Sequence, residues 1–300
     1  MAPAAGPSRG ELRMFRSDKP IAEKGGRTLP LWLVDTRVEW PTAKGGASTF
    51  AIVDTGARTT LIDRRFALAH GVPVVSSNVV AKDFAGKKLD TSVIHQVTLG
   101  IGPWTSRPVN VIVVELPSLF RDLGIGVIWS PQTSVPKGTM LRFNFGAGTA
   151  AMEPDTGMAA NAALLCKGEE GPVPSAATIV SVLVANQPVR LELDSGATKL
   201  GLSGASALAK ALQQAPGATA GERVGAGGAE RTLEVPPQEL KLAGQTYVAA
   251  VSMTSNADPS PGACAADGEI GLEVLQNCMV DISADRFGIR CAAARQPAAP

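Results

Sequence analysis

The chain has 300 residues, 45% of them hydrophobic, so it is long enough to bury a large core and to form two lobes. Aromatic residues make up only 4%, which predicts a core of aliphatic side chains. The 28 basic and 27 acidic residues give a net charge of +1, which offers little attraction for nucleic acid or an anionic membrane surface. We therefore expect no nucleic-acid partner and no membrane partner.

Residues 1–28 are rich in Ala, Pro and Gly, carry alternating charges and lack apolar periodicity. This composition predicts a disordered lead-in. The sequence shows neither the continuous apolar segment of a secretory signal peptide nor a stretch long enough to span a bilayer.

The first structured segment is predicted to be a β-hairpin. Residues 29–40 and 48–54 have strand-like patterns on either side of a turn rich in small residues. The second strand ends on Asp54, which is followed by the tight turn Thr55-Gly56-Ala57. Such a turn holds a carboxylate at the end of a rigid strand, close to backbone N–H groups that can bond it.

Three further elements follow in the first half. Asp63 is placed to open a short helix that ends at Gly71. Residues 123–129 pair an isoleucine with Gly126, where a chain segment can pack closely behind the aspartate turn. Residues 79–89 alternate around a glycine turn, which predicts a second hairpin whose tip contains Asp83, Phe84, Ala85 and Gly86.

The second half repeats this order. Residues 178–184 and 188–194 are predicted to form a hairpin that also ends on an aspartate, in the turn Asp194-Ser195-Gly196-Ala197. Ser203 is placed to open another short helix. The repeat of strand, turn and helix is a stronger signal than either tripeptide alone.

The match continues to the end of the second half. Residues 223–233 alternate around the turn Ala226-Gly227-Gly228, and residues 267–275 pair an isoleucine with Gly271. A third tripeptide, Asp155-Thr156-Gly157, follows no β-branched strand and has no repeat. A duplicated unit built around Asp54 and Asp194 is therefore the best account of the sequence.

These paired motifs resemble the aspartic peptidases of the pepsin and retropepsin type, which carry Asp-Thr/Ser-Gly in each half and an apolar-apolar-Gly element behind it. The resemblance covers roughly residues 29–292 and implies an all-β, bilobal fold with an active-site cleft between the lobes. It implies five segments: a lead-in or propeptide-like segment (1–28), an N-terminal lobe (29–152), an interlobe linker (153–162), a C-terminal lobe (163–292) and a tail (293–300).

The resemblance also implies roles for the residues of both turns. Asp54 and Asp194 would be the catalytic dyad, and the hydroxyls of Thr55 and Ser195 would tie the two loops together. Because one chain carries both aspartates, we expect a monomer that needs no cofactor and no metal.

The third and fourth residues of each turn support the dyad in this resemblance. Gly56 and Gly196 would keep the turns tight. Ala57 and Ala197 follow the retroviral pattern, whereas pepsin has a hydroxyl residue there. Loss of a hydrogen bond to an ionised carboxylate raises its pKa, so we expect a mildly acidic optimum instead of a strongly acidic one.

The two glycine-turn hairpins lie where the family places its flap, a hairpin that covers bound substrate. We expect Asp83, Phe84, Ala85 and Gly86 in the first hairpin, and Ala226, Gly227 and Gly228 in the second, to contact substrate. The alternative for the second hairpin is an ordinary glycine-rich turn.

The predicted function is that of an aspartic endopeptidase acting on a peptide or protein substrate. One alternative is a non-catalytic peptide- or protein-binding module that retains the bilobal aspartic-protease fold. Another is a hydrolase for a non-peptide amide or ester.

The remaining candidate residues are histidines and cysteines. His70 and His95 have no acidic or cysteine neighbours at metal-ligand spacing. If Ala284-Asp285 is the turn of the last hairpin, Cys278 faces Cys291, which leaves Cys166 and Cys264 to pair or to stay free. The cysteines favour a periplasmic or secreted protein, with four reduced thiols inside the cell as the alternative.

Overall fold

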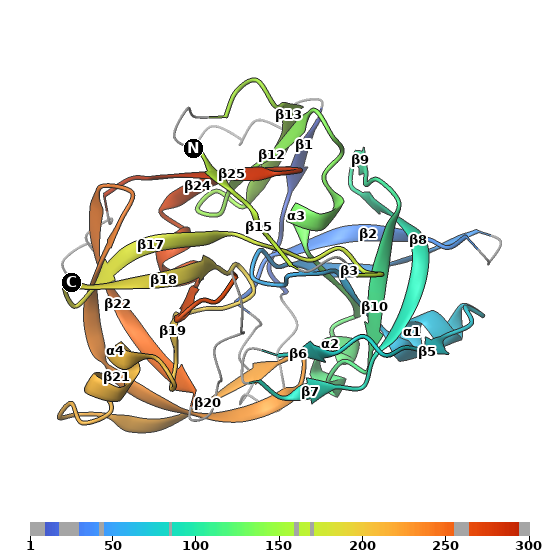
Figure 1. Cartoon of the computed structure of the whole chain (residues 1–300). Coiled ribbons are helices and arrows are strands. Elements are labelled where there is room, and N and C mark those ends of the chain that lie inside the picture. Colours follow the sequence, from blue (N-terminus) through green and yellow to red (C-terminus); the bar gives the residue numbers. More distant parts are fainter. Residues whose placement is uncertain are drawn as a thin grey trace.

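The computed structural model describes residues 10–17, 30–41, 45–83, 86–158, 162–168, 171–254 and 264–293. Most of these residues lie in strands, and the longest helices have six residues. Figure 1 shows two strand-rich lobes that lie side by side beneath a third sheet. The architecture is therefore the expected all-β, bilobal one.

The first lobe is an eight-stranded sheet with the order β10-β4-β11-β3-β2-β8-β5, and β9 pairs with β8 at its side. A separate two-stranded hairpin, β6–β7, lies at the predicted glycine turn. The strands and helices of this half are β2 (Leu33–Glu39), β3 (Gly46–Val53), β4 (Leu61–Asp63), α1 (Arg64–Ala69), β5 (Val75–Ser76), β6 (Ala81–Lys82), β7 (Lys88–Leu89), β8 (Ser92–Ile101), β9 (Trp104–Thr105), β10 (Val109–Val114), α2 (Ser118–Asp122), β11 (Ile125–Trp129) and α3 (Pro131–Ser134).

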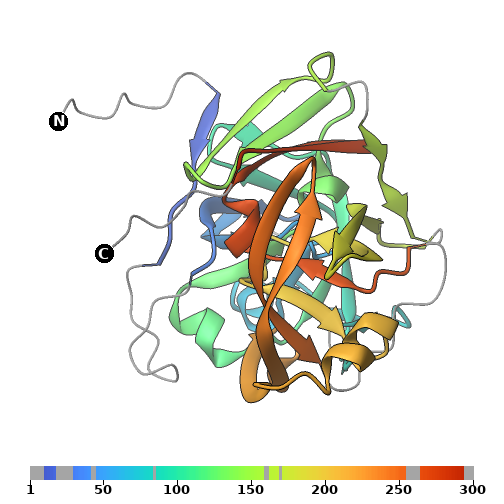
Figure 2. The same ribbon diagram turned by 90° about the vertical axis from the view of Figure 1, so that its left-hand side faces the viewer.

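The second lobe is a seven-stranded sheet with the order β17-β18-β23-β19-β22-β21-β20. Its β21 and β22 form a long twisted ribbon, drawn in orange at the front of Figure 2. The elements of this half are β14 (Ala163–Leu164), β15 (Cys166–Lys167), β16 (Ala176–Ala177), β17 (Ile179–Val184), β18 (Gln187–Leu193), β19 (Leu200–Ser203), α4 (Ala207–Leu212), β20 (Thr219–Gly225), β21 (Gly228–Leu242), β22 (Gln245–Thr254), β23 (Gly268–Ile270) and α5 (Leu272–Leu275).

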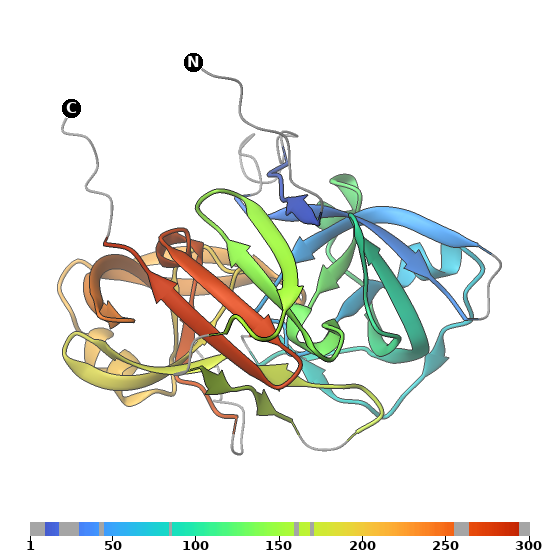
Figure 3. The same ribbon diagram turned by 90° about the horizontal axis from the view of Figure 1, so that it is seen from above.

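A third sheet joins the lobes. Its order is β1-β13-β12-β24-β25-β14, so the strands of the first half lie together, those of the second half lie together, and the two sets meet where β12 pairs with β24 (Figure 3). Its strands not yet given are β1 (Glu11–Arg13), β12 (Thr139–Asn144), β13 (Thr149–Pro154), β24 (Cys278–Ser283) and β25 (Arg286–Cys291). The pairing of β12 with β24 joins the two lobes, and Phe143 on β12 and Phe287 on β25 are buried in this sheet. The segment expected as a linker begins inside β13, and residues 159–161 lie outside the described residues.

The prediction of a disordered lead-in is wrong for residues 11–15. β1 pairs with β13, and Phe15 forms a bridge with Leu33. Leu12 and Met14 are buried, and the rings of Phe15 and Phe50 meet edge to face at 5.2 Å. The apolar side chains that hold this strand are too few for a periodic pattern, which is why composition alone suggested disorder.

Both lobes contain the same strand–turn–strand–helix unit. In the first, β11 lies parallel to β3 and pairs Trp129 with Val53; in the second, β23 lies parallel to β18 and pairs Ile270 with Leu193. A short helix follows at once, capped by Ser130 in the first lobe and Gly271 in the second.

The structure corrects two sequence-based predictions. The counterpart of Gly271 is Ser130 and not Gly126. A Cβ on Gly271 would collide with the Lys199 backbone, so the glycine is required only in the second lobe. The second short helix is capped by Ser206, whose hydroxyl accepts from the Ala209 N–H, and not by Ser203.

The last hairpin has the predicted register. Cys278 lies opposite Cys291 and Ile282 opposite Phe287. Cys278 forms a disulfide with Cys291, and the remaining two cysteines form a disulfide between Cys166 and Cys264.

Candidate active site

Asp54 and Asp194 each follow the end of a strand, and a parallel neighbouring strand bonds the backbone at each position. The Asp54 N–H donates to the Trp129 carbonyl at 2.9 Å, and the Asp194 N–H donates to the Ile270 carbonyl at 3.0 Å. The parallel strands β11 and β23 therefore fix the backbone of both turns.

Backbone N–H groups bond both carboxyl groups, but not equally. Oδ1 of Asp54 accepts from Gly56 at 2.9 Å and from Ala57 at 2.8 Å. Oδ1 of Asp194 accepts from Gly196 at 2.7 Å. In the second turn, the Ala197 N–H instead bonds the Asp194 backbone carbonyl at 3.3 Å. The two turns thus have similar backbones but different hydrogen bonds at the carboxylate.

The hydroxyls of Thr55 and Ser195 cross between the two loops. The Thr55 N–H donates to Ser195 Oγ at 3.1 Å, and the Ser195 N–H donates to Thr55 Oγ1 at 3.0 Å. Each hydroxyl in turn donates at 2.7 Å to the strand of the other lobe, Thr55 to Leu193 and Ser195 to Val53. Both side chains are fully buried, so this closed network locks one loop to the other.

The glycines of the two turns allow the carboxyl groups to approach the opposite loop. A Cβ on Gly196 would lie 2.5 Å from the Asp54 carboxyl carbon, and a Cβ on Gly56 would overlap the Asp194 carboxyl. The two carboxyl groups are also hydrogen-bonded to each other. The interface between the lobes therefore brings the two predicted aspartates together as a pair.

Burial sets the protonation of the pair. Burial raises the pKa of Asp54 to about 6, whereas the hydrogen bonds from Asp194 and from the Ala57 N–H act to lower it. It raises the pKa of Asp194 to about 8, and the negative charge of Asp54 adds to that rise. Two close carboxylates cannot both ionise easily, so the pair holds one proton between these two values.

Residues 41–129, which include the first turn, match the family model described as aspartyl protease. The chain resembles the pepsin- and retropepsin-type aspartic peptidases. The second turn lies beyond the matched range, and the internal duplication connects it to the first. A search of curated proteins found no match.

Two solved structures match this chain at low sequence identity. The crystal structure of the aspartic proteinase from Irpex lacteus matches with a TM-score of 0.48 and 12% identity, covering 94% of this chain and 97% of that one. The EIAV protease complexed with the inhibitor HBY-793 matches with a TM-score of 0.25 and 18% identity, covering 33% of this chain and 86% of that one.

Gln132 supports the first turn of this aspartic-peptidase-like site, and sequence reasoning missed it. Its amide nitrogen donates to the carbonyls of Thr55 at 3.0 Å, Ala57 at 2.8 Å and Ala176 at 3.3 Å. Its counterpart in the second lobe, Glu273, is exposed. A buried glutamine on α3 can be recognised only once the helix is placed under the turn.

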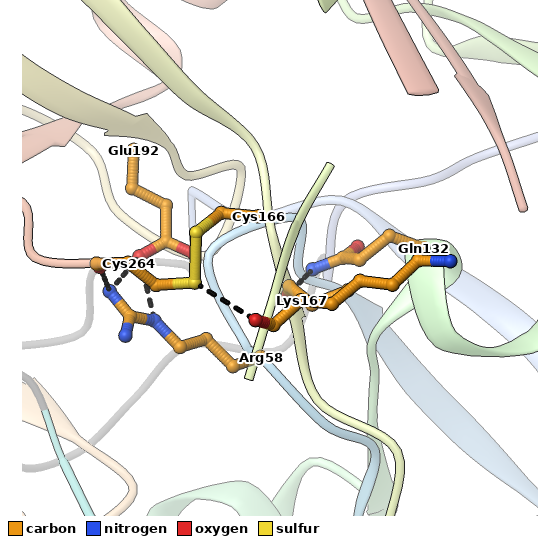
Figure 4. Close-up of a disulfide and its surroundings, with 7 residues drawn as sticks. Arg58, Gln132, Cys166, Lys167, Glu192 and Cys264 are labelled. Atoms are coloured by element: carbon orange, nitrogen blue, oxygen red, sulfur yellow. Dashed lines mark hydrogen bonds and ion pairs between the residues drawn. A yellow bond between two sulfur atoms is a disulfide. The ribbon is translucent and has the colours of Figure 1, made fainter. Parts of the chain in front are cut away.

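Arg58, which follows the first aspartate turn, bridges the two lobes (Figure 4). Its guanidinium donates to Oε2 of Glu192 at 3.1 and 3.2 Å and to the Cys264 carbonyl at 2.9 Å. Cys264 is held by its disulfide to Cys166, so the arginine joins the first aspartate loop to a cross-linked loop of the second lobe.

A second buried ion pair was also not recognised from the sequence. Arg223 on β20 donates to Glu269 on β23, whose side chain is only 4% exposed. Glu269 is in turn hydrogen-bonded to Asp194. A third carboxyl group therefore touches the dyad from the second lobe.

The tips of the two glycine-turn hairpins meet (Figure 1). Lys87 Nζ donates to the Gly227 carbonyl, and Gly227 packs against the Asp83 carboxylate. Gly86, Ala226 and Gly228 lie at the same junction, whereas Phe84 and Ala85 lie outside the described residues. A hollow of about 440 Å³ lies beside this junction, between the hairpin tips and residues 114–121.

The other candidates lie away from this site. Asp155 accepts from Arg286 at 3.2 Å at the end of β13, so it belongs to the sheet that joins the lobes. Within the described ranges, no three His, Cys, Asp or Glu side chains are grouped to hold a metal ion. His70 bonds the Phe66 carbonyl at 2.8 Å and His95 is exposed on β8. None of the helices in the described part of the chain is both long and apolar enough to cross a membrane.

Proposed function

We propose that the protein is an aspartic endopeptidase whose dyad is Asp54 and Asp194. One observation carries the proposal: each carboxyl group packs against the glycine of the other turn and the two are hydrogen-bonded to each other. A shared proton and a site for one water between two carboxyl groups are what general acid–base hydrolysis of an amide needs.

The unequal pKa values assign a role to each aspartate. Between pH 6 and 8, Asp54 is the ionised member and Asp194 the protonated one. Asp54 takes a proton from a water as the water oxygen attacks the scissile carbonyl carbon. Asp194 donates its proton toward the carbonyl oxygen, giving a neutral tetrahedral diol. Asp54 then gives its proton to the amine nitrogen while Asp194 takes a proton from one hydroxyl of the diol, so the C–N bond breaks and the pair returns to its starting state.

The contact between the hairpin tips supports a covered site. Lys87 and Gly227 join the two hairpins, so an extended peptide can be enclosed between them and the dyad. In this proposal the second hairpin contributes to substrate binding together with the first.

The proposal also implies that a single chain is sufficient for activity. Both half-sites and their interlocked hydroxyls come from one chain. Activity per molecule should therefore stay constant on dilution. A steep fall that accompanies dissociation of a dimer would contradict this.

The test is cleavage of a diverse peptide library from pH 4 to pH 9 by the parent protein and by Asp54→Asn, Asp194→Asn and the double variant. Each single variant should lose nearly as much activity as the double one, because both groups act in the same step. Each should fold at least as stably as the parent, since the substitution removes the repulsion between two close carboxyl groups.

Asp155→Asn is the matched control, because it changes the third Asp-Thr-Gly tripeptide, which lies outside the site. It should cleave peptides at the parent rate. Activity that survives in Asp194→Asn would contradict the assignment of the dyad. A folded parent that cleaves no peptide at any pH would favour the non-catalytic binding module.

A further inference from the structure

The short helix after β11 or β23 bonds the aspartate turn of its lobe, but the two lobes use different groups. In the second lobe, α5 begins at Leu272, whose backbone N–H donates to the Ala197 carbonyl at 2.9 Å. The same helix position in the first lobe is Pro131, which has no N–H. The corresponding carbonyl, that of Ala57, is bonded by the Gln132 side chain at 2.8 Å. A side-chain amide therefore replaces a backbone N–H in the first lobe.

The side-chain amide holds one carbonyl more than a single backbone N–H can. An amide nitrogen carries two hydrogens, and Nε2 of Gln132 donates to Thr55 at 3.0 Å as well as to Ala57. It also bonds the Ala176 carbonyl of the second lobe at 3.3 Å. Three carbonyl oxygens around this atom identify it as the nitrogen, because the amide oxygen would be repelled there. The first turn is thus held at two carbonyls.

Holding these carbonyls fixes the direction of the N–H groups in the turn. The Thr55 carbonyl and the Gly56 N–H belong to one planar trans peptide group, so they point in opposite directions. Since Gln132 bonds the carbonyl, the Gly56 N–H faces away from the helix and donates to Oδ1 of Asp54 at 2.9 Å. The Ala57 N–H lies between the two held carbonyls and donates to the same oxygen at 2.8 Å.

The second turn differs at the matching N–H group. Gly196 donates to Oδ1 of Asp194 at 2.7 Å, but the Ala197 N–H bonds the Asp194 backbone carbonyl at 3.3 Å. The counterpart of Gln132 is Glu273, whose side chain is exposed. Two N–H groups on the carboxylate therefore accompany the buried amide, and one accompanies the exposed glutamate.

We propose that Gln132 is a positioning residue that holds two carbonyls of the first turn and so keeps two N–H groups on the Asp54 carboxylate. This inference rests on the proposed function, in which Asp54 is the ionised member of the dyad. The bonds from Gly56 and Ala57 lower the pKa of Asp54, whereas burial raises it. The charged and titratable groups around the turn are Asp194, Glu269, Arg58, Glu192 and Arg223.

Two substitutions of Gln132 test this role. Gln132→Met removes both N–H donors and keeps an unbranched side chain of similar length. The turn should then relax toward the arrangement of the second lobe, with the Ala57 N–H directed away from the carboxylate. Asp54 loses a bond that favours its ionised form, so it should hold its proton more strongly. Gln132→Asn keeps the amide on a side chain one methylene shorter and should act in the same direction by less, which provides the test if Gln132→Met does not fold.

The experiment follows the first titration step of the pair at Asp54 by ¹³C-carboxyl NMR of the full chain with labelled aspartate, assigned by comparison with Asp54→Asn. In Gln132→Met this midpoint should rise by about half to one pH unit, and the acid limb of the peptide-cleavage profile should rise with it. We expect kcat to fall about tenfold and KM to change little, because Gln132 bonds the turn on the side opposite the carboxylate.

Thr133→Val is the matched control. Thr133 lies next to Gln132 on α3, is similarly buried, and donates its hydroxyl to the Ser130 carbonyl at 3.0 Å and not to the turn. This variant should lose stability without moving the Asp54 midpoint. An unchanged midpoint in both Gln132 variants, or an equal rise in Thr133→Val, would overturn the proposal.

The two readouts separate this proposal from the proposed function. If the protein cleaves no peptide, the endopeptidase assignment fails, but the NMR midpoint still tests whether Gln132 keeps the N–H groups on Asp54. If cleavage depends on both aspartates but the midpoint does not move in the Gln132 variants, only the role of Gln132 is lost.

Discussion

The first lobe surrounds its aspartate with backbone N–H groups and apolar side chains, whereas the second lobe surrounds its aspartate with charge. Asp54 accepts two backbone bonds in front of the Ile52–Ile128 pair. Asp194 accepts one and touches Glu269. Since the strands behind both turns share one register, the backbone makes the site symmetric and the side chains make it unequal. A proton shared by two carboxyl groups needs both properties.

Substituting the glycines of the two turns tests the symmetric part of the site. In Gly56→Ala or Gly196→Ala the new Cβ would overlap the opposite carboxyl group, so the two aspartates must move apart. A displacement of about 1 Å can cost 10²-fold in rate, and we expect kcat/KM to fall by that order or more in either variant. The measurement is steady-state peptide cleavage.

Gly157→Ala is the matched control for the glycine variants. It lies in the third Asp-Thr-Gly tripeptide, where the nearest atom to a new Cβ is 3.7 Å away. Its kcat/KM should equal that of the parent. A similar loss in Gly157→Ala and Gly196→Ala would show that the glycines act on general stability and not on the pair of aspartates.

The hydroxyl network is the second symmetric feature. Thr55→Val and Ser195→Ala each leave buried backbone groups without partners, at a cost of about 1–3 kcal/mol in unfolding free energy. Because the two hydroxyls share one network, the double variant should cost less than the sum of the single ones. Urea unfolding of the three variants measures this, and strict additivity would mean that the two hydroxyls act independently.

The symmetric features were predictable from the sequence because they depend on local patterns. A strand followed by Asp-Thr/Ser-Gly-Ala places an aspartate and a hydroxyl in each turn, and the pattern recurs in order. The register of the last hairpin followed from one turn, which placed Cys278 opposite Cys291. Short-range chemistry was sufficient in these cases.

The unequal features could not be predicted in this way. Glu269 and Arg223 lie 46 residues apart, and their pairing depends on the placement of β20 against β23. Gln132 needs α3 to lie beneath a turn 75 residues earlier. The helix cap was placed at Ser203 and not at Ser206 because either serine suits a cap, and only the packing of α4 distinguishes them.

Glu192 provides a pH test of the charged lobe. Burial raises the pKa of Glu192 from 4.5 to about 7, although Arg58 lowers it. A raised pKa in the folded state means that the stability linked to this group is present below pH 4.5 and is lost as pH rises to about 7. Glu192→Gln removes this dependence. The unfolding free energy of the variant, compared with that of the parent, should therefore rise by about 1–3 kcal/mol as the pH increases from 4.5 to about 7.

Ile52→Val provides the matching variant in the apolar lobe. It removes one buried methyl group and should cost about 1 kcal/mol at every pH between 4.5 and 7. Thermal or urea unfolding at several pH values measures both variants. A pH-independent difference between Glu192→Gln and the parent would mean that Glu192 stays ionised in the folded protein.

The smallest effects are expected from the alanines that end the two turns, and they distinguish the two aspartates most directly. Ala57→Ser adds a hydroxyl beside Asp54, whose Oδ1 already accepts from the Ala57 N–H at 2.8 Å. A hydrogen bond to the ionised form lowers a carboxylate's pKa, so the acid limb of the cleavage profile should move to lower pH by about half a unit. Ala197→Ser adds the same hydroxyl beside Asp194 and should move the alkaline limb instead. The measurement is the pH dependence of kcat/KM for both variants. If both variants moved the same limb, the assignment of Asp54 as the ionised member and Asp194 as the protonated member would be contradicted.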